Sequence, residues 1–139
     1  MKVVIDTNVL VSGLIKPGSP PELILLLVLN DQVNLYISGD IFQEYGQVLS
    51  RGKFGKYLNS KRIKTFLSEI KERAVEINPQ VAVHLIKEDP ADNKFLECAL
   101  EANADFFITG NKRHFPFKKF HKTRIVTPVE FLSMITNLL

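Results

Sequence analysis

A continuous apolar run near the start of the chain ends in an acidic residue. Residues 3–5 are Val-Val-Ile, and Asp6 follows them directly. An apolar run without polar alternation is typical of a strand that is covered on both faces, as in parallel sheets flanked by helices. The run therefore predicts a buried parallel strand that carries the Asp6 carboxylate to the carboxyl edge of a sheet, where ligands bind in open α/β folds.

Strand-like and helix-like segments alternate along the chain. The predicted strands cover residues 2–6, 33–37, 74–77, 105–109 and 124–127. The predicted helices run from Thr7 through Leu14, over 21–30, from Ser38 through Leu49, over 60–73, over 90–102 and from Thr127 onward, with a helix-like or irregular turn at 81–86. This alternation predicts an α/β fold with a parallel sheet, in one three-layer domain over residues 1–139.

Capping residues predict where three of these helices begin. Thr7 is expected to cap the first helix, because its hydroxyl suits that position. Asp89 is expected to cap the helix over 90–102, with Pro90 at the first helical position. Thr127 and Glu130 have the spacing of a capping box.

Composition narrows the class of protein. The chain is 45% hydrophobic and 24% charged, and its one cysteine, Cys98, cannot form an internal disulfide. An acid at position 6 argues against a signal peptide. The run Leu23–Leu29 is too short to span a bilayer and predicts a buried helix. We therefore expect a cytoplasmic protein without a membrane segment.

Charge is distributed unevenly around a formal net charge of +3. Residues 51–73 hold eight basic residues against two acids, and residues 111–124 hold six Lys or Arg and no acid. Such stretches suit a polyanionic substrate, although Lys and Arg runs also solvate helix faces, and the 51–73 stretch does not decide between the two. Phe115, Phe117 and Phe120 lie within the second stretch; they could stack on bases, but we favour anchors in the core.

Two acids in the first half of the chain are candidates for a site. Asp6 could simply cap the following helix, yet Thr7 could do so unaided, and we favour the site. On the helix from Ser38, Glu44 falls at the boundary of the apolar face. It could lean over a crevice or be a solvated boundary residue, and spacing alone leaves both open.

Two further candidates lie in the second half. On a helix that begins at Pro90, Asp92 shares an azimuth with the apolar face and points inward, although an Asp89–Asp92 capping pair is the competing interpretation. Asn111 follows the second apolar strand as Asp6 follows the first, so the two would meet in one crevice. As an isolated triplet, Thr109-Gly110-Asn111 is more typical of a turn. Several acids in one crevice would repel one another unless a cation shared the site.

Taken together, these segments resemble a known family. The segments that carry the resemblance are residues 3–10 (VVIDTNVL), Glu44, residues 88–95 (EDPADNKF), residues 104–111 (ADFFITGN) and residues 125–132 (IVTPVEFL). They resemble the PIN domain, in the branch of VapC-like toxins of toxin–antitoxin pairs. The resemblance covers nearly the whole chain, and the ordered set is more specific than any one motif.

The resemblance implies a Rossmann-like α/β/α sandwich with a central parallel sheet and a Mg²⁺- or Mn²⁺-dependent ribonuclease. It implies Asp6, Glu44 and Asp92 as catalytic and metal-binding residues, with Asn111 as a metal ligand where relatives commonly have Asp. Asn8 and Thr109 match supporting positions. The implied partners are an RNA substrate, an antitoxin protein and a second copy of the chain. The basic residues expected to contact RNA are Lys112, Arg113, Lys118 and Lys119.

Other functions remain open on the sequence. Asn111 removes one carboxylate from the family's quartet, which favours weakened catalysis or an inactive RNA-binding module on the same fold. An Asp after a buried strand also serves as a phosphoryl acceptor in phosphotransfer proteins. That function requires a second acid two residues later, where Asn8 stands.

The missing carboxylate leads to a prediction about ion binding. Because Asn111 supplies an oxygen ligand without charge, any second ion is expected to bind weakly until an RNA phosphate completes its ligands. Calorimetric titration of the RNA-free protein with Mn²⁺ should therefore give one dominant site. Two equally tight sites would contradict this expectation.

Overall fold

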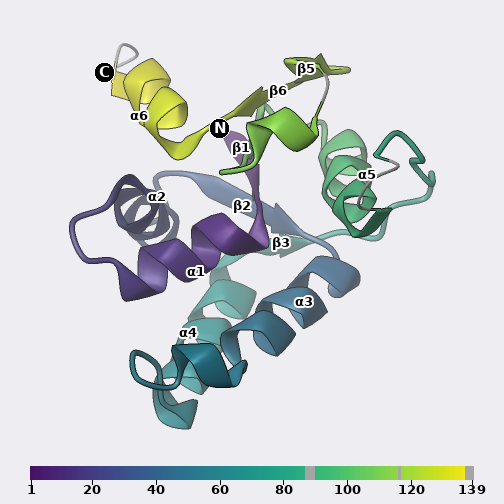
Figure 1. Cartoon of the computed structure of the whole chain (residues 1–139). Helices are drawn as coiled ribbons and strands as arrows, with labels where there is room; N and C mark the ends of the chain where they lie inside the picture. Colours follow the sequence, from purple (N-terminus) through teal and green to yellow (C-terminus); the bar gives the residue numbers. More distant parts are fainter. Residues whose placement is uncertain (87–89, 116, 137–139) are drawn as a thin grey trace.

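The computed structural model describes residues 1–86, 90–115 and 117–136, which form a sheet between helical layers (Figure 1). Within that part of the chain the strand order is β3-β2-β1-β4-β6-β5. The strands are β1 (Lys2–Ile5), β2 (Asn34–Ile37), β3 (Val75–Glu76), β4 (Phe106–Ile108), β5 (Lys119–Phe120) and β6 (Thr123–Val126). The predicted α/β class and parallel sheet are confirmed.

One edge of the sheet differs from the prediction. β5 pairs with β6 in the antiparallel direction, and the remaining neighbours pair in parallel. The two short strands are joined through His121, whose φ of 53° is in the left-handed region. The sheet is therefore mixed. Periodicity cannot detect a strand of two residues inside a basic stretch, so β5 was not predicted.

Helices cover both faces of the sheet. Helix α5 (Asn93–Ala102) packs on β1, β2 and β4. On the opposite side lie α1 (Thr7–Ile15), α2 (Pro20–Leu29) and α6 (Pro128–Thr136), as Figure 1 shows. Helix α3 (Gly39–Leu49) contacts both α1 and α5, and α4 (Ser60–Arg73) packs against α2 and α3. Both helical layers are thus linked by α3.

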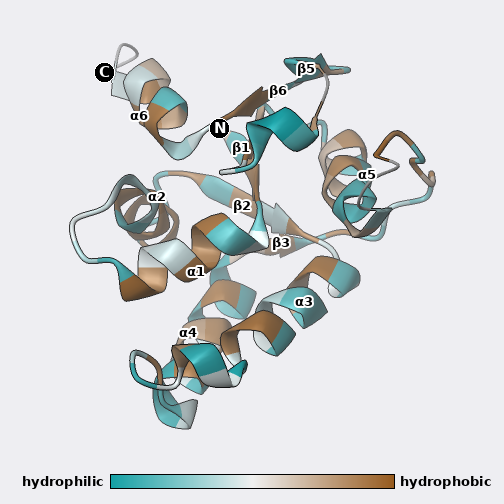
Figure 2. Cartoon of the chain, viewed as in Figure 1, coloured by the Kyte–Doolittle hydropathy of each residue, from teal (hydrophilic) through white to brown (hydrophobic). Residues whose placement is uncertain are grey.

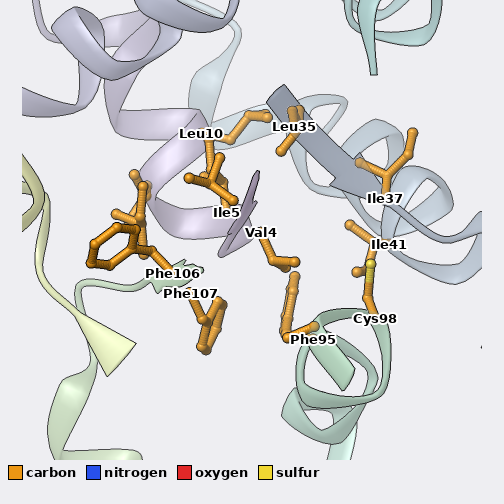
Figure 3. Packing of buried hydrophobic residues seen from close by; sticks show 14 of the residues in the cluster. Val4, Ile5, Leu10, Leu35, Ile37, Ile41, Phe95, Cys98, Phe106 and Phe107 are labelled. Atoms are coloured by element: carbon orange, nitrogen blue, oxygen red, sulfur yellow. The ribbon is translucent and has the colours of Figure 1, made fainter. Parts of the chain in front are cut away.

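Two consecutive phenylalanines on β4 pack against helices on opposite faces of the sheet. Successive strand residues point to opposite faces. Phe107 stacks on Phe95 of α5 with ring centroids 5.5 Å apart, and Phe106 meets Phe131 of α6 edge to face at 5.3 Å. Figure 3 shows Phe107 beside Phe95, with Phe106 directed away from both. This packing holds β4 rigidly beside β1, from which the polar strand ends emerge.

Side-chain caps start several helices, but the cap predicted for the first helix is wrong. Ser19, Ser38 and Asn59 cap α2, α3 and α4, each accepting a backbone N–H bond three residues ahead. Asp6, not Thr7, occupies the N-cap position of α1, and its side chain makes no capping bond. Thr7 is the first helical residue because its hydroxyl is used elsewhere, as described below.

Helix α5 begins later than predicted. Residues Pro90–Asp92 form the 3₁₀ turn η2, and the α-helix starts at Asn93, whose side chain bonds both the N–H and the C=O of Ile86. A 3₁₀ turn does not follow the 100° spacing of an α-helix, so the predicted azimuth of Asp92 does not apply. The predicted cap, Asp89, lies outside the described residues. The Thr127–Glu130 capping box is confirmed in both directions.

A stripe on α5 fixes the irregular segment before it. Three side chains at four-residue spacing hold successive backbone groups: Asn93 holds Ile86, Glu97 accepts from Val83 N–H at 2.9 Å, and Glu101 accepts from Gln80 N–H at 3.0 Å. Residues 81–86 are irregular, which is one of the two predicted forms. This stripe forms one wall of the groove described below.

The apolar run on α2 is buried on one side only. Ile24, Leu25 and Val28 are buried, whereas Leu23 and Leu26 are exposed, so the predicted buried helix is only half correct. Figure 2 shows hydrophobic and hydrophilic residues interleaved along the neighbouring helices α3 and α4. No single described helix is long and apolar enough to cross a membrane; α1 and α2 pass that test only as a pair, bent by 96°.

The close approach of α1 to α2 depends on Gly13. A Cβ there would lie 2.5 Å from Leu25 Cδ1 and 2.9 Å from the backbone oxygen of Pro21.

We expect Gly13→Ala to destabilise the protein by about 1–3 kcal/mol, because the clash is partly with backbone. Gly46→Ala is the matched helical control. Its Cβ would lie 3.6 Å from Leu67 Cδ1, and helix propensity should stabilise the fold by about 0.5–1 kcal/mol. Denaturant unfolding followed by circular dichroism measures both, and equal effects would contradict the close-approach argument.

Candidate functional site at the carboxyl edge of the sheet

The carboxylate of Asp6 is buried at the end of β1. Its residue is 5% exposed, and its backbone N–H donates to Ile108 O at 2.9 Å, extending the pairing with β4. Burial raises the pKa of Asp6; a hydrogen bond from Thr109 opposes this shift, and the charge of Glu44 adds to it. Keeping the Asp6 carboxylate ionised therefore costs free energy unless a hydrogen-bond donor or a cation lies beside it.

The end of β4 supplies that donor. Thr109 is fully buried, and its Oγ1 donates to Asp6 Oδ2 at 2.7 Å. The same hydroxyl oxygen accepts from the backbone N–H of Asn111 at 3.0 Å. Because β1 and β4 pair in parallel with Ile5 opposite Ile108, their polar ends meet as the sequence predicted. The observed link to Asn111 runs through its backbone, while Asn8 is exposed on α1.

Glu44 of α3 lies between two protein donors. Thr7 Oγ1 donates a short hydrogen bond to Glu44 Oε2, and Lys94 Nζ of α5 forms an ion pair with Glu44 Oε1 at 2.5 Å. The side chains of Lys94 and Glu44 are 17% and 26% exposed. Glu44 lines the groove described below, so it leans over a crevice and is not a solvated boundary residue. The bond to Glu44 also explains why Thr7 does not cap α1.

Tyr45 positions α3 against the strand that carries Asp6. Its ring is fully buried, and its hydroxyl donates to the backbone oxygen of Ile5 at 2.6 Å. Burial raises the pKa of Tyr45 far above its ordinary value, with further contributions from Cys98, Asp6 and Glu44. Tyr45 therefore stays a neutral donor, and this bond holds Glu44, one residue earlier, near the end of β1.

Asp92 lies at the start of α5 with a different contact. Its side chain is 16% exposed, and its Oδ2 is 3.6 Å from Nδ1 of His114 in the 3₁₀ turn η3 (Lys112–His114). Asp92 is thus mostly buried, although not for the helical-angle reason proposed above. The structure joins Asp6 to Thr109 and Glu44 to Thr7, whereas Asp92 contacts the loop after β4.

The donor chemistry of these residues suits a hard divalent cation. Carboxylate, hydroxyl and amide oxygens are the ligands that Mg²⁺ and Mn²⁺ favour. Across residues 1–86, 90–115 and 117–136, no three His, Cys, Asp or Glu side chains form a group that could hold a metal ion. Glu44 instead holds the ammonium group of Lys94.

A groove of about 520 Å³ opens beside Glu44 and Lys94. Its volume is within the range of small-ligand sites. Helices α3 and α5 and the segment fixed by the α5 stripe form its walls. The lining residues are Asp40, Gln43, Glu44, Gln47, Val83, His84, Pro90, Ala91, Asn93, Lys94 and Glu97.

In the basic stretch after β4, one lysine forms an ion pair within the protein and the other candidate residues are exposed. Lys112 Nζ lies 2.9 and 3.0 Å from the two carboxylate oxygens of Glu130. The pKa of Glu130 is lowered, first by the hydrogen bond from the backbone N–H of Thr127 and then by the contact with Lys112. Arg113, Lys118 and Lys119 are exposed. The aromatic side chains anchor the loop as expected: Phe115 and Phe120 are buried and Phe117 packs on the core.

Three site residues were not predicted in their observed roles. The sequence indicates Thr7 as a helix cap, and it indicates neither Tyr45 nor Lys94 as a candidate site residue. Their partners lie 37, 40 and 50 residues away, and no local spacing connects them. Cys98 was expected in the core and is fully buried, which raises the pKa of its thiol to about 12.

Comparison with known proteins gives consistent matches. Residues 2–113 match the family model described as the PIN domain. The uncharacterized protein MJ1680 of Methanocaldococcus jannaschii is 35% identical over 143 aligned positions, covering 96% of this chain and 90% of that protein.

Two crystal structures have a similar fold, each at 17% identity, which shows the fold alone. One is VapBC2 from Rickettsia felis bound to a DNA fragment from their promoter, with a TM-score of 0.60 over 90% of this chain and 97% of that chain. The other is FitAcB from Neisseria gonorrhoeae, with a TM-score of 0.55 over 91% and 98%.

The raised pKa of Asp6 predicts how stability depends on pH. The folded protein binds the Asp6 proton more tightly than the unfolded chain, so the free energy of unfolding falls as pH rises from the ordinary value of 3.8 through the raised folded pKa. Asp6→Asn should therefore stabilise the metal-free protein at neutral pH, and the difference should vanish below pH 3.8.

Denaturant midpoints at neutral and acidic pH measure this difference. Asp40→Asn is the control, because Asp40 is exposed in the first turn of α3. That substitution should leave stability unchanged or lower it slightly at neutral pH, since the helix dipole favours the acid. An Asp6→Asn protein that is less stable than wild type at neutral pH would contradict the predicted cost of burial.

Proposed function

Because the chain belongs to the PIN-domain family, we propose that it is a metal-dependent endoribonuclease that hydrolyses RNA phosphodiester bonds. PIN domains are generally nucleases and usually use divalent metal ions. The observation that carries the proposal is the buried Asp6 carboxylate at the carboxyl edge of a parallel sheet, with Glu44 hydrogen-bonded to the next residue, Thr7, and a groove beside Glu44. Two acids held at one edge of the sheet favour a cation as a further partner.

In this proposal Asp6, Glu44 and Asp92 would hold Mg²⁺ or Mn²⁺, and Asn111 would add a neutral oxygen. When bound, a divalent ion supplies an activated water and stabilises negative charge on the phosphate being cleaved. The chain's own residues keep the acids in place: Thr109 holds one Asp6 oxygen, and Tyr45 holds β1 against α3. Preorganisation of this kind matters because misplaced ligands weaken catalysis steeply.

The basic stretch after β4 would contact the RNA backbone. Arg113, Lys118 and Lys119 are exposed, and phosphate contacts of this type supply affinity without sequence preference. Lys112 is a weaker candidate, because Glu130 already compensates its charge. These residues follow β4 along the chain, which would place bound RNA across the acidic edge.

The resemblance to VapC-like toxins supports a place in a toxin–antitoxin pair in the cytoplasm. In that role the chain would form a homodimer or a larger homo-oligomer, and an antitoxin protein would block the acidic edge. Two of the solved structures with a similar fold, VapBC2 and FitAcB, are consistent with this role.

Two observations favour a second candidate function. Asn111 replaces a carboxylate that the family commonly has, and Lys94 already compensates Glu44. A PIN fold with weakened or absent catalysis would act as an RNA-binding module. Undiminished RNA affinity without cleavage in Mg²⁺, Mn²⁺ or other divalent ions would support this function over the nuclease.

Cleavage of a mixed RNA pool in Mn²⁺ tests the nuclease. Asp6→Asn should lower the rate by about 100-fold, because one charged group at the reacting centre is lost. Asn111→Asp should raise the rate, because it restores the fourth carboxylate. EDTA should abolish cleavage.

Asp31→Asn is the matched control for this experiment. It makes the same acid-to-amide change at an exposed residue before β2, at the amino end of the parallel strands, and should keep nearly the full rate. Cleavage that survives EDTA or Asp6→Asn would rule out the proposed mechanism.

A further inference from the structure

Glu44 already has a cation beside it, supplied by the chain itself. Lys94 Nζ lies 2.5 Å from Glu44 Oε1, and Thr7 donates to the other oxygen, so both carboxylate oxygens are in contact with protein donors. The two charged side chains are only 17% and 26% exposed, so solvent screens this pair less than a surface ion pair. An ordered pair at this depth has a larger effect on its surroundings than an exposed one.

Lys94 also compensates the repulsion between the two acids. Asp6 is 5% exposed, and Glu44 accepts a hydrogen bond from Thr7, the residue that directly follows Asp6. Without a cation, two ionised carboxylates would share a poorly hydrated edge of the sheet. The ammonium group of Lys94 removes part of this cost, as a divalent ion at the same edge would do.

We propose that Lys94 occupies the cation position beside Glu44, so that Lys94 and a divalent metal ion are alternative partners of this carboxylate. The inference rests on the proposed function, since it concerns the ion of that same site. The acidic site is completed only when the Lys94 ammonium leaves Glu44.

The surroundings of Lys94 allow that movement. Lys94 lies in the first turn of α5, and its side chain lines the groove of about 520 Å³ between α3 and α5. The groove has room for the ammonium group to move away from Glu44 while helix α5 stays in place. Its Nζ also lies 5.4 Å from the centre of the Phe95 ring, a weaker contact that does not depend on Glu44.

Mn²⁺ binding to the full chain tests this inference directly. The electron paramagnetic resonance signal of free aqueous Mn²⁺ reports the unbound ion and therefore the dissociation constant, without any need for cleavage. Lys94→Met removes the competing charge and should bind Mn²⁺ about tenfold more tightly than wild type. The rise in melting temperature on adding Mn²⁺ should be larger for the same variant.

The matched control is Lys122→Met. Lys122 also pairs with a carboxylate, Asp105 Oδ1 at 3.5 Å, but its partner accepts a backbone bond from Lys2 at the opposite end of β1. Its Mn²⁺ affinity should stay within about twofold of wild type, since surface charges are screened. If Lys94→Met does not fold, Lys94→Gln, which keeps a donor toward Glu44, is measured instead and should also bind more tightly than wild type.

Unchanged or weaker Mn²⁺ binding by the folded Lys94 variant would overturn the inference. Asp6→Asn, introduced into wild type and into Lys94→Met, separates this failure from that of the proposed function. If Asp6→Asn abolishes binding while Lys94→Met leaves it unchanged, only the inference about Lys94 falls. If binding survives Asp6→Asn in both backgrounds, or if no variant binds Mn²⁺, the proposed metal site falls as well.

Discussion

Parallel pairing of β1 with β4 is the constraint on which the candidate site depends. The register sets Ile5 opposite Ile108, and the backbone N–H of Asp6 continues the pairing by donating to Ile108 O at 2.9 Å. Thr109, the residue that follows β4, then has its hydroxyl 2.7 Å from the Asp6 carboxylate. A shift of one residue would turn every side chain to the other face and leave Asp6 buried without this donor.

The polar contacts near Asp6 are explained by the free-energy cost of burying its charge. Tyr45 ties α3 to the backbone of β1, which brings Glu44 near Asp6. The second acid then requires compensation of its own, and Thr7 and Lys94 supply it. In the metal-free protein this arrangement stabilises the charged edge. In the proposed nuclease it also sets the competition that an incoming ion must overcome, and the groove beside Lys94 provides room for the exchange.

Local patterns were sufficient for most of the fold. The apolar runs predicted β1 and β4, and the predicted helix over residues 60–73 has the range of α4 in the structure. Prediction failed where a side chain had a distant partner. Thr7 bonds Glu44 instead of capping α1, and Asn93 bonds Ile86 at the point where α5 begins. β5 was missed because two residues are too few to show a period.

The amino-acid sequence by itself determined the α/β class and the delivery of Asp6 and Thr109 to one edge of the sheet, because strand periodicity and parallel pairing are properties of short segments. Only the tertiary structure decided which groups surround the acids. Lys94 and Glu44 are 50 residues apart in the chain and meet because α5 and α3 pack against the same sheet. Electrostatic interaction depends on distance in space and on the local dielectric, and neither is encoded in the spacing of residues along the sequence.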